Sequence, residues 1–253
     1  MANRDEILDY CAQLLEIEEF DDYGPNGLQV PGAAEVSRVA TGVSANVEFL
    51  RGAVDFGAEL ILVHHGLLWG DELEPFSMPM AARLRTVLCD DASLAAYHLP
   101  LDAHPEIGNN ALLRARLGLR EDPRPFGDAK GRPIGKIGRA KAPLTIEELD
   151  SRLREATGRE PLVFDCGPER IEAVGISTGA GGFAIHEAGP LGLDALVIGE
   201  PSEPLMGEAR EYGVHLLAGG HYATETFGIA RLGELVSERF GVEHRFIDVP
   251  NPI

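Results

Sequence analysis

The chain has 253 residues, enough for one large α/β domain or for two domains of roughly 125 residues with a core each. Acidic residues outnumber basic ones by 41 to 22, and the resulting net charge of −19 argues against a nucleic-acid partner. No apolar run approaches the ~20 residues of a membrane span, and the N-terminus lacks a signal-peptide pattern, so we expect a cytoplasmic protein with no membrane partner. The three cysteines form no CxxC pair and indicate neither a disulfide frame nor a zinc knuckle.

Helical and strand patterns alternate through the first half of the chain. The first helix pattern covers residues 3–17, where Asn3 and Glu6 have the spacing of a capping box. The next helix is predicted to be capped by Ser44 and to end at Gly57. The other elements expected before residue 120 are strands over 36–44, 58–66 and 93–99 and helices over 80–91 and 109–119.

The second half begins with a basic stretch, residues 124–141, which holds six basic residues and one Asp. It is interpreted either as a solvated connection between the two halves or as a patch that attracts phosphate. A capping box of Thr145 and Glu148 starts the next predicted helix, which ends at Gly158. The elements expected later are strands over 171–177, 194–200, 214–220 and 244–249 and helices over 182–189, 204–213 and 224–241.

Residues 39–66 and 173–200 share one pattern: a strand, a Gly-Val-Ser or Gly-Ile-Ser turn, a helix, an aliphatic strand and a polar pair. This alignment sets His64-His65 against Gly199-Glu200. We therefore expect an α/β protein with an internal duplication. Each half is predicted to be a three-layer α/β/α unit with a mixed, mostly parallel sheet. The first half, residues 1–125, carries the HH and HxxxD motifs, and the second, residues 126–253, carries the IGE and GHxxTE motifs.

Two adjacent histidines, His64 and His65, end a buried strand in the stretch "LILVHHGLLWG". Neighbouring side chains on a strand point to opposite faces, so the two imidazoles cannot share one metal ion while they stay on the strand. A turn through Gly66 would let both tilt toward the sheet edge, where each could bind one of two metal ions. The alternative is that one histidine packs or caps while the other binds.

Two further clusters strengthen the metal interpretation. His98 and Asp102 follow another strand, and His221 and Glu225 are spaced i, i+4 at the start of a helix, which places both on one face. A mixed set of imidazoles and carboxylates suits Zn, Mn or Fe(II) better than Mg or Ca. The remaining histidines are expected to be surface or core residues: His104, His186, His215 and His244.

The chain resembles the Nif-three-like dinuclear-metal proteins, also known as the GTP cyclohydrolase I type 2 family. The resemblance rests on motifs that follow one another along nearly the whole chain: "NGLQV", "VHHGLLW", "YHLPLD", "GNNALLRARLGL", "IGE" and "GGHYATETFG". Two departures are visible. The family's His-Thr-Asn-Leu-Asp pattern reads "HLPLD" here, which puts a substrate contact through Leu99 or Pro100 in doubt, and its Thr-Gly-Glu reads Ile198-Gly199-Glu200.

The resemblance implies a duplicated α/β fold, a toroidal homohexamer and two divalent metal ions per chain. The metal ligands that it implies are His64, His65, Asp102, His221 and Glu225.

Two kinds of function follow from these expectations. The first is a metal-dependent hydrolase of a nucleotide-like small molecule, acting either as a GTP cyclohydrolase on the guanine imidazole ring or as a phosphoesterase on phosphorus. His98 or Glu200 would then carry protons. The second is non-catalytic: a hexameric assembly that stores or delivers metal, or a regulatory scaffold.

Overall fold

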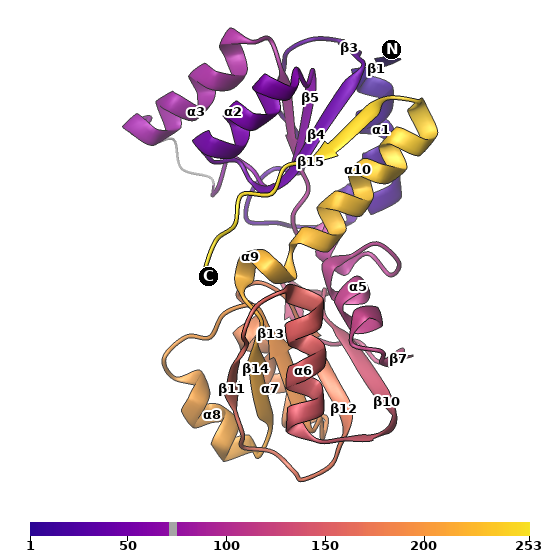
Figure 1. Cartoon of the computed structure of the whole chain (residues 1–253), viewed down its shortest axis with the longest axis vertical. Helices are drawn as coiled ribbons and strands as arrows, with labels where there is room; N and C mark the ends of the chain where they lie inside the picture. The colour runs from indigo at the N-terminus through magenta and orange to yellow at the C-terminus, as the bar shows by residue number, and fades with distance from the viewer. Residues whose placement is uncertain (71–74) are drawn as a thin grey trace. The chain divides into compact units, whose positions relative to one another are not determined.

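The computed structural model describes residues 1–70 and 75–253, and these residues form two compact units (Figure 1). Unit 1 comprises Met1–Leu101 and Gly228–Val249, and unit 2 comprises Asp102–Phe227 and Pro250–Ile253. No helix among the described residues combines the length and the apolar character needed to cross a membrane.

The division differs from the expected boundary after residue 125 for two reasons. Strand β7 (Arg120–Asp122) pairs with β10 (Lys136–Leu144), so the segment around it belongs with unit 2. Strand β15 (Glu243–Phe246) pairs in parallel with β4 (Arg38–Ser44), so the end of the chain returns to unit 1. Hydrogen-bonded ladders between distant segments, and not the position along the chain, therefore decide the division.

Unit 1 is built on a five-stranded sheet with the order β15-β4-β5-β6-β2, in which only β2 is antiparallel to its neighbour. The other strands of this sheet are β5 (Leu60–His65), β6 (Ser93–Ala96) and β2 (Gly27–Val30). Helices cover both faces: α2 (Val47–Phe56) and α3 (Met78–Cys89) on one, α1 (Arg4–Leu15) and α10 (Thr226–Phe240) on the other (Figure 1). The smaller elements are β1 (Ala2–Asn3), the short helix η1 (Ile17–Glu19), β3 (Glu35–Val36) and α4 (Leu99–Ala103), which runs across the boundary of the units.

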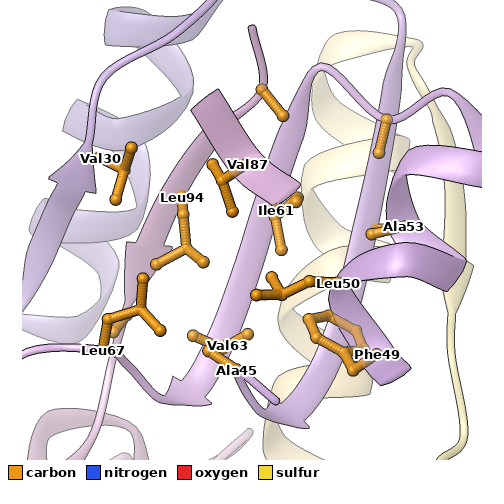
Figure 2. Close-up of a cluster of buried hydrophobic side chains, with 14 residues drawn as sticks. Val30, Ala45, Phe49, Leu50, Ala53, Ile61, Val63, Leu67, Val87 and Leu94 are labelled. Atoms are coloured by element: carbon orange, nitrogen blue, oxygen red, sulfur yellow. The ribbon is translucent and has the colours of Figure 1, made fainter. Parts of the chain in front are cut away.

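One apolar core of unit 1 lies between the sheet and helices α2 and α3. Figure 2 shows Phe49 and Leu50 from α2 packed over Ile61 and Val63 of β5, and all four side chains are at most 1% exposed. Strand β5 is buried on both faces, which explains why its sequence is almost continuously aliphatic.

Helix α2 begins two residues later than the sequence predicted. Its N-cap is Asn46, whose side chain accepts a hydrogen bond from the Phe49 N–H, whereas Ser44 remains the last residue of β4. The prediction that Ser44 caps this helix is therefore wrong. Asn and Ser are about equally good N-caps. Ser44 stays in strand β4 because it pairs with His65 in the ladder, so Asn46 becomes the cap.

Unit 2 is built on a six-stranded sheet with the order β11-β14-β13-β12-β10-β7. Only the β12-β13 and β13-β14 pairs are parallel. The remaining strands are β11 (Leu162–Phe164), β12 (Ile171–Ser177), β13 (Ala195–Ile198) and β14 (His215–Ala218). Side chains from α5 (Asn109–Arg116) and α6 (Ile146–Thr157) form one core cluster, and side chains from α7 (Ile185–Ala188) and α8 (Leu205–Tyr212) form another. The short elements are β8 (Asp128–Ala129), β9 (Arg132–Pro133), η2 (Gly181–Ala184) and α9 (His221–Thr224).

Each unit is thus a mixed α/β structure, and each contains three parallel strands in consecutive order, β4-β5-β6 and β12-β13-β14. The register differs from the sequence alignment by two residues. Ser44 pairs with His65, and the matching Ser177 pairs with Ile198, so Glu200 lies two residues beyond the position equivalent to His65.

The basic stretch 124–141 is part of unit 2. It contains the β8–β9 hairpin and the first half of β10, which pairs with β7 and β12. Arg124 and Arg139 both donate to the Asp122 carboxylate. Part of the basic charge is therefore neutralised within the sheet.

Candidate metal centre

Unit 1 carries three imidazoles that lie together, His64, His65 and His98, called here the imidazole cluster. One ligand nitrogen of each lies within 4.8 Å of the others. The ring centroids of His64 and His65 are 4.7 Å apart, and that of His98 is 5.1 Å from His64 and 5.6 Å from His65. His64 is fully buried, and the other two are partly exposed.

The two adjacent histidines are the last residues of β5, and the chain turns directly after them at Gly66. A Cβ at Gly66 would overlap the side-chain amide of Gln29 and the Cβ of Ala96, so a larger residue would have to displace them. Gln29 Oε1 in turn accepts hydrogen bonds from the N–H groups of Leu67, at 2.7 Å, and Leu68, at 3.3 Å. The glutamine of the "NGLQV" motif therefore holds the turn that follows the two histidines.

Each imidazole of the cluster is held through its Nδ1. His64 Nδ1 donates to the Tyr97 carbonyl at 2.9 Å, and His98 Nδ1 donates to Asp22 Oδ1 at 2.7 Å. Both acceptors lack a proton, so in the neutral rings Nε2 carries the lone pair with which an imidazole binds a metal ion. His65 Nδ1 lies 3.0 Å from the Ser44 hydroxyl, which can donate or accept.

Unit 2 carries a second group, Asp102, His221 and Glu225, called here the carboxylate cluster. Ligand oxygens of Asp102 and Glu225 lie within 4.8 Å of each other, and the two residues are 4% and 3% exposed. His221 Nε2 lies 3.1 Å from Glu225 Oε2, which confirms that the i, i+4 spacing sets both side chains on one face. Asp102 Oδ1 accepts a hydrogen bond from Asn109 at 2.7 Å.

His221 lies between two carboxylates. Its Nδ1 is 3.0 Å from Glu200 Oε1, on the side opposite Glu225. Burial lowers the pKa of His221, but hydrogen bonds and charge interactions with Glu225 and Glu200 outweigh it and raise that pKa from 6.5 to about 9. A proton on His221 thus offsets carboxylate charge in the protein without metal.

Gly179, which follows β12, holds the carboxylate cluster together. Its carbonyl accepts from the N–H groups of Gly199 (2.9 Å) and Glu200 (3.0 Å), and its N–H donates to Thr224 Oγ1 at 3.2 Å. It has φ +61°, and a Cβ there would collide with Glu225 Oε1 and lie 3.2 Å from His221 Nε2. The glycine of the "STGAGG" stretch is therefore required for both its conformation and its small size.

The remaining histidines have structural partners, as the sequence analysis expected. His215 is buried and bonds to Pro168 O and Gly167 N, His244 bonds to Thr41, and His186 lies on the surface near Tyr212. His104 Nδ1 accepts from the N–H groups of Glu106 and Ile107. Leu99, which replaces a polar residue of the family pattern, is 3% exposed.

All the predicted site residues except Glu200 thus lie in one of the two clusters, and Glu200 is hydrogen-bonded to His221 of the carboxylate cluster. Sequence reasoning missed the residues that orient them, chiefly Asp22, Ser44, Asn109 and Gly179. Asn109 lies in the motif "GNNALLRARLGL", and Asn26, which bonds both Asp22 and His98, begins the motif "NGLQV". Their places in these motifs were the sequence signal that could have identified them. Asp22 lies just before "NGLQV", and no pattern marked it.

The donor set fits divalent metal ions. Neutral imidazoles with the lone pair on Nε2 and buried carboxylates are typical ligands of Zn, Mn and Fe(II). Two buried carboxylates close together also need a positive charge beside them, because neither is well hydrated. Asp22 accepts a hydrogen bond from His98, Asn109 donates one to Asp102, and Glu200 accepts one from His221. Such bonds match those of the outer partners that orient metal ligands.

Comparison with known proteins agrees with the fold. The family model described as Duf34/NIF3 (NGG1p interacting factor 3) matches residues 2–252. A "GTP cyclohydrolase 1 type 2 homolog" of Deinococcus radiodurans is 39% identical over 247 residues, with 98% of this chain and 93% of the relative covered. A protein of the same name from Vibrio cholerae is 43% identical over 236 residues, with 92% of each covered.

A solved structure described as protein ybgI, of unknown function, superimposes with a TM-score of 0.93 at 39% identity and covers all of both chains. The match therefore extends over both units and includes every motif that the sequence analysis singled out. The chain belongs to the Duf34/NIF3 family.

Proposed function

We propose that the protein binds two divalent metal ions per chain and is a metal-dependent hydrolase of a nucleotide-like small molecule. The proposed ligands are His64, His65, Asp102, His221 and Glu225. The observation that supports this most is the pairing of ligand types: imidazoles in unit 1, of which His64 has its lone pair on Nε2, and buried carboxylates in unit 2. The carboxylates would offset part of the positive charge of the metal ions, and the neutral imidazoles would leave the ions able to act as Lewis acids.

The chain's own groups divide the remaining tasks. When bound, the metal ions would supply a Lewis acid and lower the pKa of bound water toward ~7. Asp102 and Glu225 would neutralise positive charge, and Glu200 would keep the proton of His221 on Nδ1, so that Nε2 serves as the ligand. His98 would accept a proton on Nε2 from the attacking water.

The substrate class is proposed from the relatives' name, GTP cyclohydrolase 1 type 2 homolog. A GTP cyclohydrolase would direct the nucleophile at the guanine imidazole ring, and a phosphoesterase would direct it at phosphorus. A non-catalytic metal-storage or regulatory role is the second candidate, because an acidic chain with net charge −19 attracts cations with or without turnover.

Metal analysis followed by a nucleotide turnover screen tests this function. Purified protein should carry close to two divalent ions per chain by mass spectrometry. Hydrolysis of a nucleotide should vanish on chelation and return with Mn, Fe(II) or Zn. Two bound ions with no turnover on GTP, other nucleotides or phosphoesters would favour the storage or scaffold role.

Ligand variants sharpen the metal assignment. His64→Ala should lower the metal content, and Asp102→Ala should lower it further, because we propose that this carboxylate bridges both ions. Unchanged metal content in Asp102→Ala would contradict the bridging role. Circular dichroism should show both variants folded, since His64 lies at the end of β5, Asp102 lies in the short helix α4, and neither belongs to an apolar core cluster.

We also propose that the chain assembles as a homohexamer, as its resemblance to the family implies. Light scattering at micromolar concentration should give six times the chain mass of 27.2 kDa. A clean monomer would contradict this assembly.

A further inference from the structure

We propose that Asp22 is the positioning residue of His98: it fixes the imidazole with the proton on Nδ1 and the lone pair on Nε2, facing the imidazole cluster. In its consequence for catalysis, this inference rests on the proposed hydrolase function. The orientation of the ring does not depend on that function and can be tested separately.

The Asp22 carboxylate can only accept hydrogen bonds where it lies. Its Oδ1 accepts from His98 Nδ1 at 2.7 Å and from the Tyr23 N–H at 2.6 Å. Its Oδ2 accepts from Asn26 Nδ2 and from the Leu99 N–H, both at 2.9 Å. The side chain is 2% exposed, and although burial raises its pKa, the bonds and charge of His98 and the bond from Asn26 lower that pKa overall. The carboxylate is thus ionised, and His98 has to be the donor.

Neighbouring groups leave the His98 ring little freedom to turn away. The backbone N–H of His98 donates to Asn26 Oδ1 at 2.8 Å, so one asparagine bonds both the histidine and its carboxylate partner. The Trp69 ring meets His98 edge-on, with centroids 5.1 Å apart and planes at 85°. The side chain is 19% exposed, enough for a small molecule to approach it.

With Nδ1 of His98 bonded to Asp22, its Nε2 is the nitrogen available to the imidazole cluster, where the reaction is proposed to occur. One ring nitrogen of His98 lies within 4.8 Å of ligand nitrogens of His64 and His65. Because Nδ1 is bonded to Asp22, Nε2 is the nitrogen left to act toward the cluster. A proton transferred from the oxygen of the attacking water would form a new Nε2–H bond as the O–H bond breaks. The resulting imidazolium would be stabilised by the Asp22 carboxylate, as in other carboxylate–histidine pairs.

Asp22→Asn is the decisive variant. With the asparagine carbonyl in the place of Oδ2, the bonds from Asn26 and Leu99 are retained. The amide NH₂ then takes the place of Oδ1, so the bond from the Tyr23 N–H is lost. The same NH₂ faces His98 Nδ1, which must become an acceptor, and the ring proton moves to Nε2. The matched control is Asp21→Asn, the same charge change at the exposed neighbouring position.

The first measurement is the tautomer of His98 in metal-free protein, read from long-range proton–nitrogen NMR correlations and assigned with His98→Gln. Wild type and Asp21→Asn should show Nδ1–H, and Asp22→Asn should show Nε2–H. An Nε2–H tautomer in the wild type would overturn the positioning role. The NMR measurement on wild-type protein requires neither a folded Asp22 variant nor a substrate.

The second measurement is turnover with metal bound. Asp22→Asn should lower kcat by roughly 10–100-fold with KM nearly unchanged and with the metal content of the wild type. The double variant Asp22→Asn/His98→Gln should be no slower than His98→Gln, since Asp22 acts only through His98. A wild-type kcat in Asp22→Asn, or additive losses in the double variant, would overturn the inference. Absence of turnover in wild type would count against the proposed function, and the tautomer would still decide the inference.

Discussion

Units 1 and 2 share a core of three parallel strands but differ in the polar residues beyond the strand ends. In unit 1, β5 and β6 lead into three imidazoles whose Nδ1 atoms are all held by the protein. In unit 2, β13 and β14 lead into Glu200, His221 and Glu225, in which carboxylates outnumber the imidazole. The same backbone pattern therefore presents neutral donors in one unit and anionic donors in the other.

This difference shows how a duplicated scaffold can separate two requirements of a metal site. Imidazoles bind a divalent ion without changing its charge, whereas carboxylates offset the charge. In the absence of metal, only unit 2 has to manage repulsion between buried anions, and the proton on His221 does so. Substitutions in unit 2 should therefore disturb charge balance as well as coordination.

The largest expected effect is that of Glu225→Gln. Loss of a buried anionic ligand should weaken metal binding by more than ~100-fold and remove turnover. This exceeds the roughly 10–100-fold loss expected when a residue that only hydrogen-bonds to a ligand is replaced. Calorimetric titration with Mn or Zn measures the affinity. Glu160→Gln is the control, because that glutamate is 73% exposed and forms its ion pair with Arg154.

Glu200→Gln should be milder, because Glu200 bonds to His221 Nδ1 and is not proposed as a ligand. Two bound ions should remain, with affinity lowered by roughly 10–100-fold and turnover reduced. Metal loss equal to that of Glu225→Gln would make Glu200 a ligand. Full activity would reduce it to a structural role.

Gly179→Ala should have a smaller but specific effect. Gly179 and Gly192 both have positive φ, +61° and +65°, so alanine at either should cost about 1 kcal/mol of unfolding free energy. A Cβ at Gly192 meets nothing within 4 Å, whereas one at Gly179 collides with the Glu225 carboxylate. Only Gly179→Ala should therefore also weaken metal binding, by at least ~10-fold. Equal metal affinity in the two variants would show that Glu225 is not held by this contact.

The smallest expected effect is a pH dependence of stability in metal-free protein. His221 has a folded pKa of about 9, above the ordinary 6.5, so its ion pairs stabilise the folded state fully below pH 6.5. The contribution declines as pH rises through about 9. The difference in Tm between wild type and Glu200→Gln, measured with chelator, should shrink over that range. The exposed His186–Glu208 pair, tested with Glu208→Gln, should show almost no difference, and a constant difference for Glu200→Gln would contradict the assignment.

Local pattern in the sequence was enough to predict the alternating α/β elements and the residues of both clusters. The capping box of Thr145 and Glu148 is set by helix geometry alone, and it is observed. His221 and Glu225 do lie together as their i, i+4 spacing suggested, although Glu225 is the C-cap of α9 and lies outside the helix. The strand ends were predictable because long apolar runs stop at polar pairs.

The tertiary structure decided which groups orient those residues. Asp22 and His98 are 76 positions apart, and Ser44 meets His65 only because β4 and β5 pair in that register. The return of β15 to unit 1 and the two-residue offset of Glu200 likewise depend on strand ladders. A hydrogen bond between distant segments is set by how the sheet aligns them, and no periodicity within either segment records that alignment.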